Sequence, residues 1–334
     1  MNATSPPYSV LVCGAGNIAH RFDTPDGDEV FTHVKGFLRH GGFRVAAIID
    51  EQRARAEEAA HLWNISHAGQ CLEDVAGERF DVVSVCTPDH THAAYLREIL
   101  ALRPKLVFCE KPLSASVDDA TRIVEEYAAQ GVLLAVNYSR RWLAEFHDIA
   151  ARARAGEFGA VVSARMKYYK GFLHNASHCV DLLSMITAPA ILDGAIVRSV
   201  LDYAPDDPTI SCAAFARSEI AGGGPFSLMV EGYDSRLMSP IELEITFERA
   251  LVQFEELSGS YLTIASLCEN AAYPGFFEFS ERQKRQINAS AAMRSAVASL
   301  YDALHSGAPL ASTGADALET LRLCKQMLSF PSLN

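Results

Sequence analysis

The chain of 334 residues is longer than one hydrophobic core usually serves, so we expect two domains. A net charge of −12 without a basic run argues against nucleic acid or an anionic membrane as a partner, and no apolar run reaches the roughly 18 residues of a membrane span. The 8 cysteines form no C-x-x-C pair and no secretory signal is visible, so we expect buried thiols in a cytoplasmic protein.

The first part of the chain alternates between two hydrophobic periods. Short, nearly continuous apolar runs predict strands that are buried on both faces of a parallel sheet. These runs are residues 8–14, 43–50, 81–88, 105–112 and 132–138. Apolar stripes at helical spacing lie between them, in residues 51–63, 92–102 and 116–131. The alternation predicts an α/β Rossmann domain with a doubly wound parallel sheet over residues 1–137.

The second part, residues 138–334, has a different pattern. Strand-like runs follow one another with turn residues between them, which predicts an α+β domain with a large, mostly antiparallel sheet. The predicted strands are residues 164–171, 199–205, 211–218, 226–234, 241–256 and 261–266. Predicted helices occupy residues 177–186, 286–307 and 314–328. We expect this domain to bind substrate and to form oligomers, with a final helix at about 313–329 that can pack back toward the N-terminal domain.

The first predicted strand runs into a glycine turn. Gly14, Gly16 and Ala19 fit the pattern G-x-G-x-x-A, in which the first glycine makes the turn and the second lets the backbone approach a pyrophosphate. Asp50 closes the second strand, where a carboxylate accepts the ribose hydroxyls of NAD and repels the 2′-phosphate of NADP. Because a carboxylate at this position repels a 2′-phosphate, we favour NAD over NADP as the cofactor. The alternative role for Asp50 is to cap the next helix.

Asp50 follows the glycines by more than the usual distance of about 20 residues. The intervening segment RFDTPDGDEVFT, residues 21–32, is rich in Asp and also contains Gly and Pro, which is the composition of a loop. We interpret it as an inserted surface loop beside the cofactor cleft.

Three further segments narrow the interpretation. They are TPDHTH at residues 87–92, EKP at residues 110–112 and HNASHCVD at residues 174–181. Together with the glycine turn, and in the same order along nearly the whole chain, they resemble the Gfo/Idh/MocA oxidoreductases, a family that includes glucose–fructose oxidoreductase and inositol dehydrogenase.

The resemblance implies a hydride transfer between NAD and a secondary alcohol or ketone of a sugar or a nucleotide-activated sugar. Lys111 would hydrogen-bond the substrate oxygen, and His178 would accept or donate its proton, because a histidine pKa of about 6.5 suits reversible proton transfer. The residues implied to bind the cofactor are Gly14, Gly16, Asn17, Ile18, Asp50, Thr87, Pro88, Asp89, His92, Glu110 and Lys111.

One position departs from the family pattern D-x-G-x-H-x-x-D. The aspartate four residues before the histidine is His174 here. Residues four apart on a helix share a face, so His174 could orient substrate or relay a proton, but it cannot hold a fixed negative charge. Whether His174 or His178 carries the proton stays open. Two histidines at this spacing could also bind a metal ion, but no third ligand is evident, so we expect no metal site.

Further polar residues could line the substrate site. Arginines at a domain junction could hold a phosphate or carboxylate, although ordinary surface charge is the alternative. The substrate-binding candidates are Asn137, Arg140, Arg141, Lys167, Tyr168 and Asn175.

Two other functions remain open. One is a reductase of another substrate class in the same fold, similar to dihydrodiol dehydrogenase or biliverdin reductase, and the other is a non-catalytic NAD-binding sensor. In the resembling family one face of the second sheet usually packs against its counterpart in another subunit, so we expect a homodimer or homotetramer.

Overall fold

The computed structural model describes residues 6–256 and 259–333, which form two compact units. The first unit contains the described residues up to Leu143 together with Ser290–Leu318, and the second contains Ala144–Ala289 and the described residues from Glu319. A single boundary after residue 137 was expected from the sequence. It did not anticipate that Ser290–Leu318 returns to the first unit. Among the described residues, no helix has both the length and the apolar character needed to cross a membrane.

The first unit is built on a six-stranded parallel sheet in the order β3-β2-β1-β4-β5-β6. The strands are β1 Tyr8–Cys13, β2 Phe43–Ile49, β3 His67–Gly69, β4 Val82–Val85, β5 Leu106–Cys109 and β6 Leu133–Val136. The strand order reverses between β1 and β4, which is the point where open α/β sheets bind ligands. The doubly wound Rossmann prediction is confirmed.

Helices cover this sheet. The α-helices of the unit are α1 His33–His40, α2 Arg53–Trp63, α3 His92–Ile99, α4 Val117–Ala129 and α7 Ala291–Ser306. Short helical turns are η1 Asn17–Arg21, η2 Leu72–Val75, η3 Asp89–Thr91, η4 Leu100–Leu102 and η5 Ser139–Trp142. Val10, Leu11 and Val12 are each 0% exposed, and because successive strand residues point to opposite faces, both faces of the sheet are covered.

The predicted insertion forms a loop that its own polar groups hold closed. Asp23 is buried and its Oδ2 accepts hydrogen bonds from the backbone N–H groups of Phe31 and Thr32, at 2.9 and 2.8 Å. On the other side, the buried Lys35 of α1 donates to the carbonyl oxygens of Thr24 and Gly27, both at 2.7 Å. The loop therefore has a fixed shape although it contains neither a helix nor a strand after Arg21.

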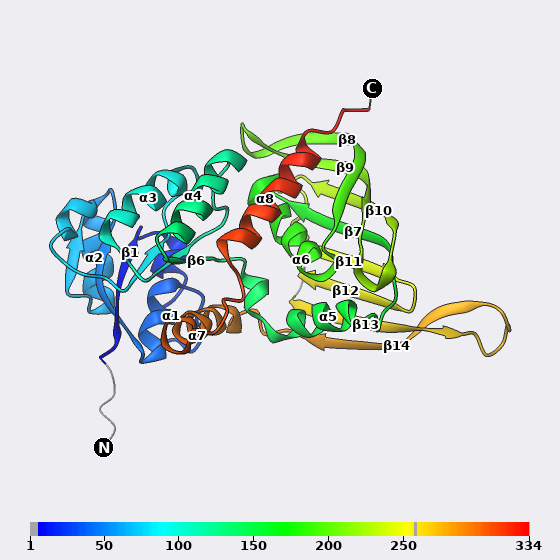
Figure 1. The fold of residues 1–334 in the computed structure, drawn as a ribbon, viewed down its shortest axis with the longest axis horizontal. Coiled ribbons are helices and arrows are strands. Elements are labelled where there is room, and N and C mark those ends of the chain that lie inside the picture. Colours follow the sequence, from blue (N-terminus) through cyan, green and yellow to red (C-terminus); the bar gives the residue numbers. More distant parts are fainter. Residues whose placement is uncertain (1–5, 257–258, 334) are drawn as a thin grey trace, which may run out of the picture. The chain divides into compact units, whose positions relative to one another are not determined.

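The second unit contains an eight-stranded sheet in the order β14-β13-β12-β11-β7-β10-β9-β8, in which only β7 and β10 are parallel neighbours (Figure 1). The strands are β7 Val161–Tyr169, β8 Ala190–Ala204, β9 Asp207–Arg217, β10 Pro225–Tyr233, β11 Glu242–Phe247, β12 Ala250–Glu256, β13 Ser260–Glu269 and β14 Phe277–Gln286. The prediction of a large, mostly antiparallel sheet is confirmed.

One face of this sheet packs against helices. They are α5 Ala144–Arg154 and α6 Ser177–Thr187, with the short turns η6 Phe172–Ala176 and η7 Ile220–Gly222. Phe146 of α5 meets Phe254 of β12 edge to face, with ring centroids 5.2 Å apart. The last helix, α8 Gly314–Leu328, begins in the first unit and ends in the second. Residues along β10 and β11 alternate between buried and more exposed, so the opposite sheet face carries the more exposed side chains.

Candidate cofactor and catalytic site

The glycine turn after β1 is shaped by close contact with Cys86, the residue that follows β4. Gly14 has a φ of +97°, and a Cβ at this position would lie 2.6 Å from the carbonyl oxygen of Cys86, so only glycine fits. A Cβ on Gly16 would meet nothing within 4 Å. The turn is thus closed against the sheet at Gly14 and open at Gly16, where the short helical turn η1 begins.

The carboxylate of Asp50 is fixed beside this turn. Asp50 is 8% exposed, and its Oδ2 accepts a hydrogen bond of 2.8 Å from the backbone N–H of Ala15. Its Oδ1 accepts another, of 2.9 Å, from the N–H of Gln52. The second bond reaches Gln52, the N-cap residue of α2, and not an N–H group of the helix itself, so Asp50 does not cap this helix. The first bond ties β2 to the glycine turn. Each oxygen keeps a lone pair for a ligand hydroxyl.

A cavity of about 290 Å³ lies at the carboxyl ends of β1, β2 and β4, at the point where the strand order reverses. It is lined by Gly14, Gly16, Asp50, Glu51, Arg55, Cys86, Thr87, Pro88, His90, Thr91 and Tyr95. Five residues predicted to bind the cofactor are therefore brought together. Asn17, Ile18, Asp89, Glu110 and Lys111 are not among the lining residues.

His92, also expected to contact the cofactor, is not among the lining residues either. It is fully buried, with Nδ1 2.7 Å from the carbonyl oxygen of Pro112 and Nε2 2.9 Å from that of Thr87. The ring therefore links the turn after β4 to the turn after β5. These two hydrogen bonds indicate that His92 holds the two turns together.

Arg55 and Tyr95 line the cavity but were not anticipated from the sequence. Arg55 belongs to the charge-rich helix α2, where nothing in the pattern separates it from its exposed neighbours. Tyr95 lies on α3, one turn after His92, and burial raises the pKa of its hydroxyl.

The residues of the EKP segment follow β5. Glu110 Oε1 accepts hydrogen bonds from Asn137 Nδ2 at 2.6 Å and from His33 Nε2 at 2.9 Å. Asn137 Oδ1 in turn accepts from Trp142 Nε1 at 2.9 Å. Asn137, a predicted substrate ligand, is 7% exposed, so its side chain is part of a buried polar network that surrounds the residue before Lys111.

Arg141, another predicted substrate ligand, is 6% exposed and forms an ion pair with Asp316 at 3.0 Å. The pair ties η5 to the start of α8 within the first unit. The ion pair gives Arg141 a role in holding the fold together. Arg140, the neighbouring candidate, is half-buried.

In the second unit, the predicted histidines lie at the junction of η6 and α6. His174 is half-buried and stacks on Tyr203, with ring centroids 4.3 Å apart and an angle of 23° between the planes. His178, in the first turn of α6, and Asn175 are half-buried too. Asp181 is buried and accepts a hydrogen bond of 3.0 Å from Thr320 Oγ1, which is a structural role.

A carboxylate lies under this segment although none occupies position 174. Asp207, at the start of β9, is 6% exposed and accepts hydrogen bonds from the backbone N–H groups of Leu173 at 2.7 Å and His174 at 2.9 Å. Burial raises its pKa above the ordinary value, against these hydrogen bonds. Sequence reasoning missed Asp207, because no local signal joins a strand start to a turn more than thirty residues earlier.

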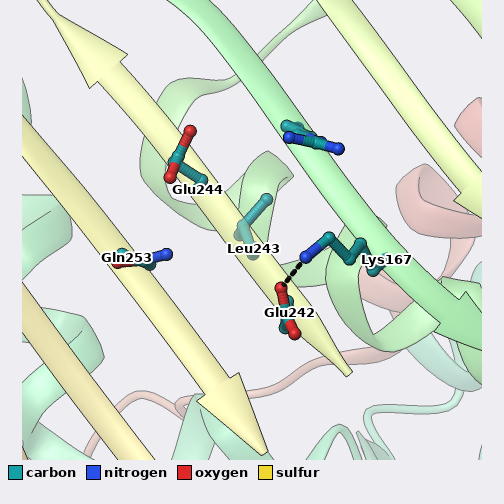
Figure 2. Close-up of a pocket in the computed structure, with 6 residues that line it drawn as sticks. Lys167, Glu242, Leu243, Glu244 and Gln253 are labelled. Carbon is teal, nitrogen blue, oxygen red and sulfur yellow. Dashed lines mark hydrogen bonds and ion pairs between the residues drawn. The ribbon is translucent and has the colours of Figure 1, made fainter. Parts of the chain in front are cut away.

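The candidates Lys167 and Tyr168 point to opposite faces of the second sheet. Lys167 Nζ forms an ion pair of 2.6 Å with Glu242 Oε2 in a shallow hollow of about 120 Å³ that Leu243, Glu244 and Gln253 also line (Figure 2). Tyr168 is 0% exposed, and its hydroxyl donates to the carbonyl oxygen of Ile210 at 2.8 Å. Tyr168 is therefore a core residue.

Nothing in the described part of the chain brings three or more His, Cys, Asp or Glu side chains together as metal ligands.

Residues 8–138 match a family model, GFO_IDH_MocA, described as an oxidoreductase family with an NAD-binding Rossmann fold. An inositol 2-dehydrogenase of Mycolicibacterium smegmatis is 38% identical to this chain over 123 residues, which cover 36% of this chain and 35% of that protein. The match spans about a third of the length of such curated relatives.

Two solved structures extend the likeness to both units. The WlbA dehydrogenase of Bordetella pertussis, in complex with NADH and UDP-GlcNAcA, has a TM-score of 0.72 at 17% identity, over 96% of this chain and 94% of its own. A 3-ketoreductase from Actinomadura kijaniata, in complex with NADP, has a TM-score of 0.73 at 14% identity, over 98% of this chain and 99% of its own. At these identities the likeness shows a shared fold.

Proposed function

Residues 8–138 match the Gfo/Idh/MocA oxidoreductase family model, and from that premise we propose that the chain is an oxidoreductase of this family that transfers a hydride between NAD and a secondary alcohol or ketone of a sugar or a nucleotide-activated sugar. The observation that carries the proposal is the cavity at the reversal of the strand order, where Asp50 is hydrogen-bonded to the glycine turn. Both features are those that a dinucleotide requires.

The residues around the cavity fit the cofactor. The open space at Gly16 lets the backbone N–H groups at the start of η1 approach a pyrophosphate, and the remaining lone pairs of Asp50 can accept ribose hydroxyls. Glu51 adds a second carboxylate to the lining, against the single cation of Arg55. This balance opposes a 2′-phosphate, so we favour NAD over NADP.

NAD supplies the hydride acceptor at its nicotinamide ring when it is bound. Of the chain's own residues, Lys111 would donate a hydrogen bond to the substrate oxygen, and His178 would hold or release the proton of the hydroxyl group. His174 would orient substrate, since its ring is itself oriented by the stack with Tyr203. Arg140 and Asn175 remain the candidates for contacts with the rest of the substrate.

The substrate class is supported by what the similar proteins act on or hold. One is named for oxidation of inositol, a cyclic polyol, and one was solved with a uridine-diphosphate sugar. Both ligands present secondary alcohols on a six-membered ring, which is the group that the proposed chemistry oxidises.

The uncovered face of the second sheet supports a homodimer or homotetramer. Phe215 and Met229 are 62% and 44% exposed there, and the strand register places Met229 beside Arg165. An apolar and charged sheet face of this kind can pair with its copy in a second subunit.

The test is a turnover assay with NAD and a panel of inositols, sugars and uridine-diphosphate sugars, read by the absorbance of NADH. We expect at least one panel member to reduce NAD, and we expect the Lys111→Ala variant to lose this activity while it still binds NADH. Tight binding of NADH by the wild-type protein without turnover of any panel member would contradict the proposal and favour an NAD-binding sensor.

A further inference from the structure

A fully buried histidine joins three parts of the first unit around the EKP segment. His33, the first residue of α1, is 0% exposed. Its Nδ1 lies 2.7 Å from the hydroxyl oxygen of Ser84 on β4, and its Nε2 donates a 2.9 Å hydrogen bond to the carboxylate of Glu110. The ring also stacks on Phe108, with centroids 4.6 Å apart. Neither the sequence motifs nor the proposed mechanism uses this histidine.

The carboxylate that His33 contacts belongs to the residue before Lys111. Burial alone raises the pKa of Glu110, but the hydrogen bond and charge of His33, the amide of Asn137 and the charge of Lys111 outweigh burial and hold this pKa below its ordinary value. Glu110 therefore carries a negative charge that interacts with the cations of both His33 and Lys111.

His33 is held in its charged form by the same contacts. Burial lowers its pKa, but the sulfur of Cys86 and the carboxylate of Glu110 raise it above the ordinary value for histidine. Cys13 on β1 and Cys109 on β5 are buried thiols whose pKa values burial raises, so they stay neutral. On α1 itself, the ammonium group of Lys35 is occupied by loop carbonyl groups.

We propose that His33 is a positioning residue for the reaction: its buried imidazolium pairs with Glu110 at 2.9 Å, so that this carboxylate does not draw the ammonium group of Lys111 away from the substrate oxygen to which Lys111 would donate a hydrogen bond. This inference rests on the proposed function, in which Lys111 meets the substrate. A buried ion pair costs desolvation that an apolar pair would avoid, so a role beyond stability is the more economical account of its presence.

The proposal makes opposite predictions for the two partners. In a His33→Gln variant the charge of Glu110 is left uncompensated, so it holds the proton of Lys111 more tightly and the lysine should titrate at higher pH. In a Glu110→Gln variant the carboxylate is lost, and the lysine should titrate at lower pH. A double variant has neither charge and should titrate near the wild type. Shifts on the order of one pH unit are expected for a charge at this range.

The experiment measures the titration of Lys111 in the cofactor-free protein. An amine-reactive acylating reagent is applied over a range of pH, and mass spectrometry of the Lys111 peptide reports its reactive fraction. His40→Gln is the matched control, because His40 ends the same helix and its ring meets those of Phe43 and Tyr301 in tilted contacts instead of contacting Glu110. This control should leave the midpoint unchanged.

An unchanged midpoint in His33→Gln would overturn the proposal, as would shifts of the same sign in both single variants. If His33→Gln does not fold, His33→Asn is measured in its place, and an unchanged or lower midpoint in that variant overturns the proposal. Because acylation needs no turnover, a protein with the expected shifts but no activity would contradict the proposed function alone.

Discussion

Replacing Gly16 with alanine tests whether this glycine is present to admit a ligand, whereas Gly14 is required by the fold itself. Gly16 has φ −85° and ψ −166°, an extended conformation that any residue adopts, and its Cβ would meet nothing within 4 Å. Alanine should therefore raise the free energy of unfolding by about 0.4–1 kcal/mol, because the unfolded chain loses conformational freedom. The same methyl group would occupy the space that a pyrophosphate needs, so NADH affinity should fall at least about tenfold, or about 1.4 kcal/mol.

Urea unfolding and calorimetric titration with NADH measure the two effects on one protein. Gly77→Ala is the matched control, because a Cβ at Gly77 also meets nothing within 4 Å and Gly77 does not line the cavity. It should leave NADH affinity unchanged. Gly14→Ala should instead lose about 1–3 kcal/mol of stability, since its φ is +97° and its Cβ would lie 2.6 Å from a carbonyl oxygen. Wild-type NADH affinity in Gly16→Ala would refute the assignment of this turn to the cofactor.

Three further predictions follow from the same geometry. Because Asp50 opposes a 2′-phosphate, NADH should bind at least about tenfold more tightly than NADPH in fluorescence titrations, and equal affinities would place Asp50 away from the ribose. The folded-state pKa of His33 is raised above 6.5 and that of Glu110 is lowered below 4.5, so the pair stabilises the folded protein fully between pH 4.5 and pH 6.5. This stabilisation is lost as pH rises through the folded-state pKa of His33 or falls through the folded-state pKa of Glu110. The difference in unfolding free energy between the wild type and His33→Gln should therefore be largest between pH 4.5 and 6.5, and a difference that does not vary with pH would contradict the pair. Light scattering should give a dimer or larger assembly, and a particle of only 36.3 kDa would count against sheet-face pairing.

Much of the first unit could be predicted because its signals are local. The strands β1 and β2 are continuous apolar runs, and the glycine turn and Asp50 stand at their ends, so pattern and spacing placed them at one edge of the sheet. The insertion between them was predictable from its composition alone.

The buried polar networks could not be predicted in this way. His33 and Glu110 are 77 residues apart, and nothing in either local pattern indicates that α1 and the end of β5 meet. The packing of α7 in the first unit is likewise set by tertiary contacts, and the helical pattern of its sequence does not specify it. By contrast, adjacent strand residues point to opposite faces, so the strand pattern already implied that Lys167 and Tyr168 could not line one site.

The activity of the Lys111, His178 and His174 variants tests the central claim most directly. Turnover and NADH affinity are measured for alanine substitutions at each position, with the substrate found in the panel. The account predicts that Lys111→Ala and His178→Ala each lower turnover by on the order of 10²–10⁴ without a comparable loss of NADH affinity, and that His174→Ala costs less. A larger loss in His174→Ala than in His178→Ala would move the proton to His174. If neither Lys111→Ala nor His178→Ala slows an active enzyme about tenfold, the catalytic assignment is contradicted.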